Sequence, residues 1–186
     1  MAKLKGELGQ GAAAVAPLSG GGAGDPLFSP EKQKKWHANN NKAMWKWEGT
    51  RLIGSGDGSY VYGGSFQPPF VAQSQFTIRK GQRTGVFFES AGMQNAAYSN
   101  KLGLRGAEAN EDQYFSYKHG VTYRCTLVVT RKQTTLYIDG KQICTGTGEK
   151  DRVEKMSISA GDGWSQGEVE VQDLLIIRAT DKVANP

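Results

Sequence analysis

Residues 123–146, YRCTLVVTRKQTTLYIDGKQICTG, decide the fold of this chain. Apolar side chains occupy every second position over 123–129, and again at Leu136 and Ile138. A period of two, built from β-branched and aromatic residues, is what a half-buried strand requires. Asp139-Gly140 supplies the positive φ angles of a two-residue hairpin turn. The stretch is therefore predicted to form three antiparallel strands, the local pattern of a two-sheet β-sandwich.

Length and composition favour a single all-β domain. The chain has 186 residues, which suits one domain with a full core and a short appendage. It has 25 glycines and 10% aromatic residues, as expected for many strands and turns. The net charge of +5 and the isoelectric point near 9.2 would mildly favour anionic partners. Because basic and acidic residues are interspersed, ordinary solubility explains this charge, and nucleic acid is not an expected partner.

The N-terminal 30 residues differ in composition from the rest. They are rich in Gly, Ala and Pro, so they are expected to form a flexible arm before a folded domain over 31–183. Two hypotheses fit the arm: a plain tail, or a segment that orders only against a neighbouring subunit. In either case, deleting residues 2–28 should change the stability of the domain only slightly.

The compartment is predicted from what the sequence lacks. No secretory signal and no apolar run of about 20 residues is seen, so an intracellular protein is expected, with a virion as the alternative and no membrane partner. Cys125 and Cys144 should flank the middle of the three strands at different heights. They are therefore expected to be free thiols.

The same alternation predicts the other strands. Ser29-Pro30-Glu31 is a good start for a short helix that runs through Trp36 and ends near residues 39–41. The predicted strands are 43–48, 51–54, 59–63, 70–80, 84–90, 99–105, 113–117, 155–160 and 168–179. Within 70–80, Phe70, Ala72, Ser74, Phe76 and Ile78 should face the core, and Val71, Gln73, Gln75, Thr77 and Arg79 the other side.

Two blocks of sequence carry a family resemblance. The first is PPFVAQSQFTIRKGQRTGVFFES, residues 68–90. The second is GVTYRCTLVVTRKQTTLYIDGKQICTG, residues 120–146, followed by a Ser-Ile-Ser strand and the closing EVQDLLIIRAT. Together they resemble the concanavalin A-like lectin/glucanase superfamily, and within it the laminin-G-like jelly rolls. The resemblance implies an all-β, two-sheet antiparallel jelly-roll sandwich, in a superfamily that includes enzymes, lectins and structural modules.

The catalytic residues of the resembling glucanases do not carry over. Those members place two glutamates on one strand with an aspartate between them, facing a cleft. The nearest match here is Glu168-Val169-Glu170, which has two carboxylates on one strand face but lacks the third acid. A solvated strand edge is the preferred interpretation, so no enzymatic activity is expected.

Metal and cofactor sites are not predicted either. Calcium-binding relatives use acidic loop residues, for which Asp57, Asp112 and Asp162 are the candidates, but no spaced Asp/Asn ladder with a terminal Glu is present. His37 and His119 have no cysteine or acid at zinc-ligand spacing. GSGDGS lacks the lysine of a phosphate-binding loop.

The preferred hypothesis is a non-catalytic binding or assembly module that recognises a glycan or a protein partner. Trp45 and Trp47 share a strand face and are expected in the core or under the helix. The candidate ligand-binding residues are Trp164, Tyr60, Tyr62, Asp57, Gln73, Gln75, Thr77 and Arg79. One alternative is a structural subunit of a virus or phage shell, or a homo-oligomer, assembled through the arm. Another, disfavoured, is a sugar-active glycoside hydrolase.

Overall fold

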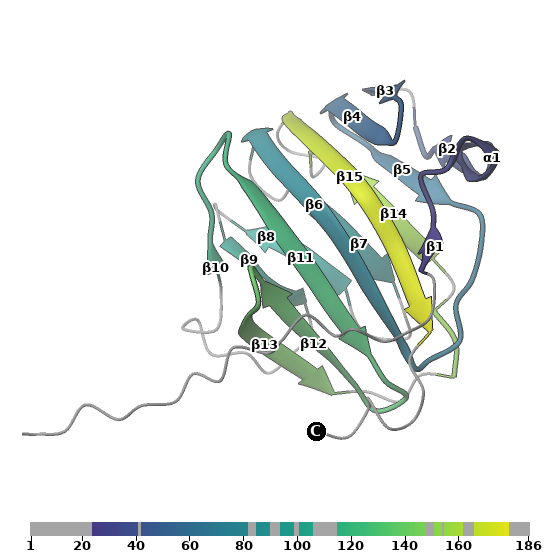
Figure 1. The fold of residues 1–186 in the computed structure, drawn as a ribbon. Coiled ribbons are helices and arrows are strands. Elements are labelled where there is room, and N and C mark those ends of the chain that lie inside the picture. Colours follow the sequence, from purple (N-terminus) through teal and green to yellow (C-terminus); the bar gives the residue numbers. More distant parts are fainter. Residues whose placement is uncertain are drawn as a thin grey trace, which may run out of the picture.

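The computed structural model describes residues 24–40, 42–81, 85–89, 94–98, 101–105, 115–147, 151–153, 155–161 and 166–178. These residues form a two-layered antiparallel β-sandwich with one short helix (Figure 1). The all-β, two-sheet architecture predicted from the sequence is confirmed.

The larger sheet forms one layer, with β6 and β15 at its centre. Across it lie β13 (Lys141–Thr147), β12 (Gln133–Ile138), β11 (Thr122–Val129), β6 (Phe70–Lys80), β15 (Gly167–Arg178), β4 (Arg51–Gly56) and β3 (Ala43–Glu48). A short strand, β1 (Asp25–Pro26), pairs with the C-terminal half of β15 beyond the end of β4. Figure 1 shows the outer face of this sheet.

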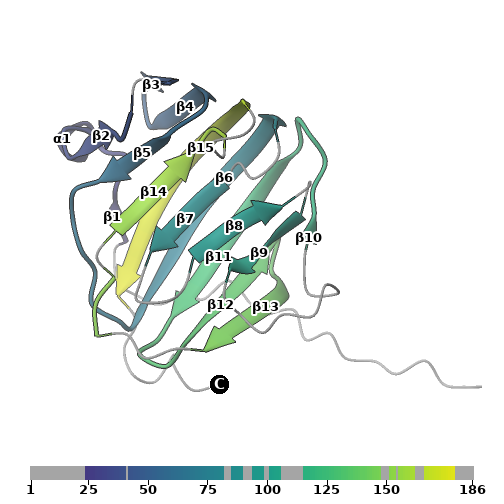
Figure 2. The ribbon, with the colours of Figure 1, turned by 180° about the vertical axis from the view of Figure 1, so that it is seen from behind.

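The second layer packs behind the larger sheet, as Figure 2 shows. Its four-stranded sheet has the order β2 (Trp36–Ala38), β5 (Ser59–Tyr62), β14 (Lys155–Ser159) and β7 (Gly85–Glu89). A three-stranded sheet continues the layer with β8 (Gln94–Tyr98), β9 (Lys101–Arg105) and β10 (Phe115–Ser116). The helix α1 (Pro30–Gln33) lies beside β2.

The three-strand stretch that decides the fold is confirmed as β11, β12 and β13. Asp139 and Gly140 have φ angles of 49° and 80°, as the hairpin turn requires. Cys125 lies opposite Ile138, whereas Cys144 lies opposite Leu136 on the other side of β12. The two cysteines therefore form no disulfide, as predicted, and both are buried. Burial raises the pKa of Cys125 to about 12.

The alternation of β6 is also confirmed. Phe70, Phe76 and Ile78 are at most 3% exposed and belong to the hydrophobic core. Burial of each such side chain contributes about 1.5–3 kcal/mol. The core therefore lies between the two layers, and the polar side chains of β6 face outward.

A β-bulge sets the orientation of the second half of β15. Two residues of β15, Asp173 and Leu174, lie where β6 offers one, and Asp173 has a φ of 55°. As a result, Leu174 turns into the core after Val171, and Asp173 is exposed. On the outer face, the backbone of Gly24 lies against Ile177.

The sandwich begins earlier in the chain than the predicted boundary at residue 31. Leu27 and Phe28 are 0% and 1% exposed, and the Leu27 amide donates to the Leu174 carbonyl at 2.9 Å. Residues 24–28 therefore belong to the folded domain, and the expectation that deleting 2–28 is harmless does not agree with this packing. The rest of the predicted arm, residues 1–23, lies outside the described residues.

The helix ends earlier than predicted because Trp36 belongs to a strand. Ser29 occupies the N-cap position and Pro30 the first turn, as expected, but the Ser29 side chain makes no cap hydrogen bond. The chain leaves the helix after Gln33, and Trp36 pairs with Tyr62 in β2. This conformation buries the indole ring, whose Nε1 donates to the Leu27 carbonyl at 3.1 Å.

Strand β8 is absent from the prediction. Its sequence, QNAAY, has no β-branched residue and no apolar alternation. The strand forms instead through backbone pairing with β9, which follows it after a two-residue connection. Its side chains lie outside what the structure describes.

Candidate functional site

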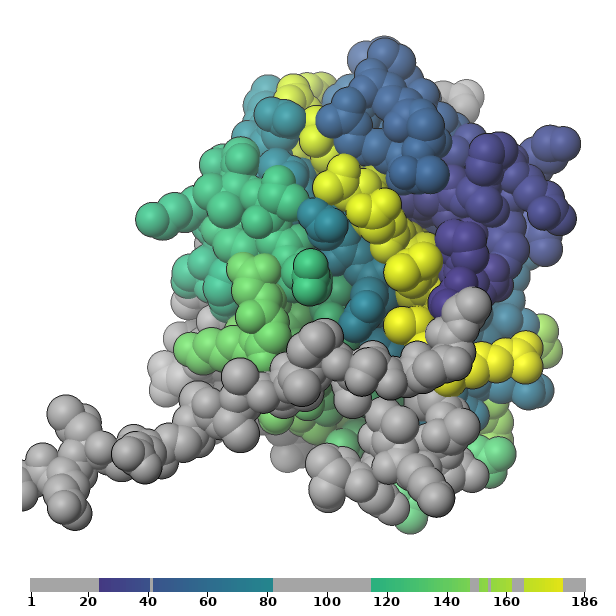
Figure 3. Space-filling view, in the orientation of Figure 1, coloured from purple at the N-terminus to yellow at the C-terminus, as the bar shows by residue number. Residues whose placement is uncertain are grey.

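Polar side chains cover part of the outer face of the larger sheet, and we call this part the polar face. It is defined by Gln73, Gln75, Thr77 and Arg79 on β6, Arg124 and Thr126 on β11, Tyr137 on β12, and Glu170, Gln172 and Asp173 on β15. Figure 3 shows this side of the molecule, with the side chains of β6 between those of β11 and β15.

Strand β6 forms the floor of the polar face. Thr77 faces outward yet is only 5% exposed, and its hydroxyl lies 2.7 Å from that of Thr122 on β11. Gln75 lies opposite Arg124 on one side and Gln172 on the other. The centre of the face is thus lined by hydrogen-bonding groups.

A ladder of side-chain amides crosses this floor. Gln172 Nε2 donates to Gln75 Oε1 at 3.1 Å, and Gln75 Nε2 donates to Asp173 Oδ2 at 3.4 Å. The bulge at Asp173 brings its carboxylate within reach of β6. Each amide offers two donors and one acceptor with two lone pairs, so the ladder leaves further hydrogen-bonding capacity toward solvent.

A second ladder, of charges, runs across four strands beside the amides. Arg79 binds Glu170 through Nε at 2.9 Å and Nη2 at 2.8 Å, and Arg51 lies 3.7 Å from the other Glu170 oxygen. Arg51 also pairs with Glu48, and Lys46 binds Glu48 at 2.7 Å. Hydrogen bonds from Lys46 and Arg51 lower the pKa of Glu48. Both oxygens of Glu170 are therefore engaged by arginines.

Tyr60 lies in an aromatic cluster between the layers. Its ring is stacked with those of Trp45 and Trp36, at centroid distances of 5.1 and 6.0 Å. The Trp47 ring is tilted relative to it, with centroids 6.1 Å apart. Trp45 and Trp47 pack against the core, as predicted. Trp45 also lies flat on Gly54, where an added Cβ would come within 2.2 Å of the indole.

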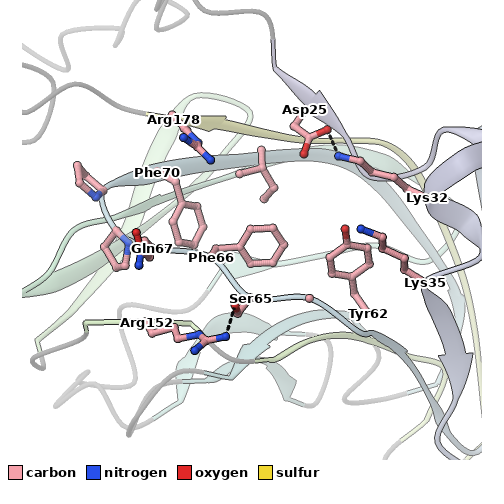
Figure 4. A pocket seen from close by; sticks show the side chains of 14 residues that line it. Asp25, Lys32, Lys35, Tyr62, Ser65, Phe66, Gln67, Phe70, Arg152 and Arg178 are labelled. Atoms are coloured by element: carbon pink, nitrogen blue, oxygen red, sulfur yellow. Dashed lines mark hydrogen bonds and ion pairs between the residues drawn. The ribbon is translucent and has the colours of Figure 1, made fainter.

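A pocket of about 780 Å³ lies at the end of the sandwich where β6 begins and β15 ends (Figure 4). We call it the end pocket. The residues that line it include Asp25, Lys32, Lys35, Tyr62, Ser65, Phe66, Gln67, Phe70, Arg152 and Arg178.

Aromatic rings form the floor of the end pocket. Tyr62 and Phe66 are stacked with centroids 5.7 Å apart and an interplanar angle of 17°, and Phe70 follows 5.7 Å from Phe66. Two backbone hydrogen bonds to Val153, of 2.9 and 2.8 Å, fix Phe66 in place. Burial raises the pKa of Tyr62, so its phenol stays neutral at physiological pH. The floor is therefore rigid and uncharged.

The structure separates the predicted ligand-binding residues into different places. Gln73, Gln75, Thr77 and Arg79 share the polar face, Tyr60 is in the aromatic cluster, and Tyr62 lines the end pocket. Asp57 follows β4 near the Gly167 end of β15, opposite the Arg178 end that borders the end pocket. Trp164, Asp112 and Asp162 lie outside the described residues. Among the residues that are described, no three His, Cys, Asp or Glu side chains group as metal ligands would.

The sequence did not indicate the end pocket. Lys35, Phe66, Arg152 and Arg178 come from four separate segments, none of which carries a recognisable binding motif. The one local signal is the Gly- and Pro-rich connection GGSFQPP at 63–69, whose turns bring Phe66 beside Tyr62.

No protein-family model matches the chain, and no curated protein matches it. Solved structures do resemble it. A galectin-like protein of unknown function from Bacillus subtilis aligns with a TM-score of 0.59 and 13% identity, over 84% of this chain and 96% of that one. The cellulose-induced protein Cip1 aligns with a TM-score of 0.65 and 10% identity, over 85% and 98% of the two chains. β-Agarase A from Zobellia galactanivorans aligns with a TM-score of 0.61 and 9% identity, over 83% and 89%.

At these identities the shared property is the fold. The chain has a galectin-like, two-sheet jelly-roll fold, which is the architecture that the sequence blocks predicted. Because one fold can support both enzymes and binding modules, the fold alone does not determine the activity. In the described part of the chain, no helix has the length and apolarity needed to cross a membrane.

Proposed function

We propose that the chain is a non-catalytic carbohydrate-binding module that holds a glycan on the polar face. The observation that carries the proposal is the amide ladder of Gln75, Gln172 and Asp173, with Gln73 beside it on β6. The fold supports only the carbohydrate part of the proposal, since the similar structures include an enzyme, β-agarase A.

The chemistry of the ladder suits sugar hydroxyls. Each hydroxyl both donates and accepts a hydrogen bond, and a side-chain amide presents a donor and an acceptor side by side. Gln73 and Gln75 point the same way from one strand, about 7 Å apart, and Gln172 lies on the next strand, about 5 Å away. A sheet holds these groups in place before the ligand arrives, which reduces the entropy lost on binding.

The non-catalytic part rests on the surroundings of Glu170. Retaining glycoside hydrolysis uses two carboxyl groups about 5 Å apart, one of which must donate a proton. Arg79 and Arg51 engage both oxygens of Glu170, so this side chain serves the charge ladder rather than facing a ligand. Glu168 is exposed at the start of β15.

The proposal is tested with the full chain on a glycan array, followed by affinity electrophoresis with the polysaccharide that binds best. Gln75→Ala and Gln172→Ala should each weaken binding by about tenfold, the effect of losing a ligand hydrogen bond of about 1.4 kcal/mol. His37→Ala is the control, because His37 is exposed on β2 in the other layer of the sandwich.

Two results would contradict the proposal. Binding that survives in both ladder variants would remove the polar face as the site. New reducing ends released from a bound polysaccharide by the purified chain would overturn its non-catalytic part.

A further inference from the structure

We propose that the end pocket is a second binding site, selective for a sugar ring that carries a carboxylate or a sulfate group. The site is separate from the polar face, because it lies where β6 begins at Phe70 and β15 ends at Arg178. The inference therefore does not depend on the amide ladder.

Uncompensated positive charge is the first reason. Four cations and one carboxylate line the pocket, and the carboxylate, Asp25, is already paired with Lys32. Arg152 donates to the neutral Ser65 hydroxyl at 2.7 Å and so keeps its full charge. Within the part of the chain that the structure describes, the Lys35 and Arg178 side chains make no ion pair. Among the described residues, three of the four cations that line the pocket thus have no carboxylate partner.

The arrangement of these cations is the second reason. They come from the segment after α1, from the residue before Val153, and from the end of β15, yet they converge on one cavity. Figure 4 shows Arg178, Arg152 and Lys35 on different sides of Phe66. Guanidinium groups present paired N–H donors that match carboxylate and sulfate oxygens, and such charge-assisted bonds are stronger than neutral ones.

The aromatic floor is the third reason, because it favours a ligand that contains a ring. Phe66, which is partly exposed and packs against the buried Tyr62, offers an apolar ring that a bare anion cannot use but the C–H face of a sugar can. The volume of about 780 Å³ falls within the range of roughly 300–1,000 Å³ of small-ligand sites. A ring on the floor would leave its acidic group within reach of the cations at the rim.

Titration of the full chain with four compounds tests this inference. The probes are D-galacturonate, galactose 6-sulfate, neutral D-galactose and inorganic sulfate, followed by calorimetry or NMR shifts. The two acidic sugars should bind about tenfold or more tightly than galactose, since one charge-assisted bond is worth at least about 1.4 kcal/mol. Their affinity should fall as salt rises from 0.05 to about 0.5 M, which screens the rim charges. The stronger acidic probe tells whether carboxylate or sulfate is preferred.

Variants assign the binding to the pocket. The double variant Lys35→Gln/Arg178→Gln should reduce the affinity for the acidic sugars to the affinity for galactose. Phe66→Ala should weaken binding of the acidic sugars and leave binding of inorganic sulfate unchanged. Lys80→Gln with Lys118→Gln is the matched control, because these exposed lysines lie at the far end of β6, about 30 Å from Phe70. Thermal melts confirm that each variant is folded.

The outcomes separate this proposal from the proposed function. Equal affinity for galactose and galacturonate, or binding unchanged in the Lys35/Arg178 variant, would overturn the acidic-sugar site. Inorganic sulfate binding as tightly as the acidic sugars would overturn the role of the ring. Gln75→Ala should leave galacturonate binding unchanged. If this variant no longer bound galacturonate, the acidic ligand would bind at the polar face and not in the end pocket.

Discussion

Replacing Phe28 with alanine should strongly destabilise the protein, although a composition-based boundary places this residue in a flexible arm. Phe28 is 1% exposed, and its ring packs edge-on against Trp36 at 5.5 Å and Trp47 at 5.0 Å. Truncation of a buried phenylalanine costs about 3–5 kcal/mol, which includes the cavity left behind. In a domain of this size, each kcal/mol shifts the Tm by about 2–4 °C, so a fall of roughly 6–20 °C is expected.

The assay is thermal and urea unfolding of the full chain, followed by near-UV circular dichroism and tryptophan fluorescence. Met44→Ala is the control, because Met44 is 77% exposed and its truncation should stay within about 0.5 kcal/mol. A Phe28→Ala protein that unfolds within a degree or two of the wild type would refute the packing of residues 24–28 into the sandwich. It would also restore the boundary near residue 31.

Three further predictions follow from the core. Gly54→Ala should cost about 1–3 kcal/mol, because its Cβ would lie 2.2 Å from the Trp45 ring, and Trp45→Ala should relieve most of this cost in a double-mutant cycle. A thiol titration should find Cys125 and Cys144 unreactive in the native protein and two thiols after denaturation; finding none would contradict the register of β11 to β13. Burial raises the pKa of Cys125 from 9.0 to about 12 and that of Tyr117 from 10.0 to about 12. Both side chains are neutral below pH 9 in the folded and the unfolded protein, and at higher pH the unfolded protein loses these protons first, which favours unfolding. The free energy of unfolding should therefore fall between about pH 9 and 12, less steeply in Cys125→Ala.

Substitutions would affect the two candidate sites differently. The polar face is built from side chains that alternate along central strands, so its residues can change without moving the backbone. The end pocket depends on a connection whose geometry is tight: an added Cβ on Gly64 would lie 2.4 Å from the Tyr62 ring. A side chain added at Gly64 would therefore displace the Tyr62 ring, whereas replacing Lys35 or Arg178 with glutamine would change mainly the charge of the rim.

The sequence by itself determined the strands whose pattern is local. The bounds of β3 and β6 coincide with the predicted ones, and the Asp139-Gly140 turn has the predicted backbone angles. The outward set that includes Gln73 and Gln75 also followed from alternation alone. These properties are readable because the period of two and the turn chemistry are encoded in neighbouring residues.

The tertiary structure alone decided which residues meet across the sandwich. Leu27 and Phe28 lie in a segment of small residues, and they enter the core only because β15 offers Leu174 as a backbone partner. Tyr62 and Arg178 are more than a hundred residues apart, yet they line one pocket. No local pattern encodes such contacts, because their free energy comes from burial and charge between segments that are joined only when the two layers close.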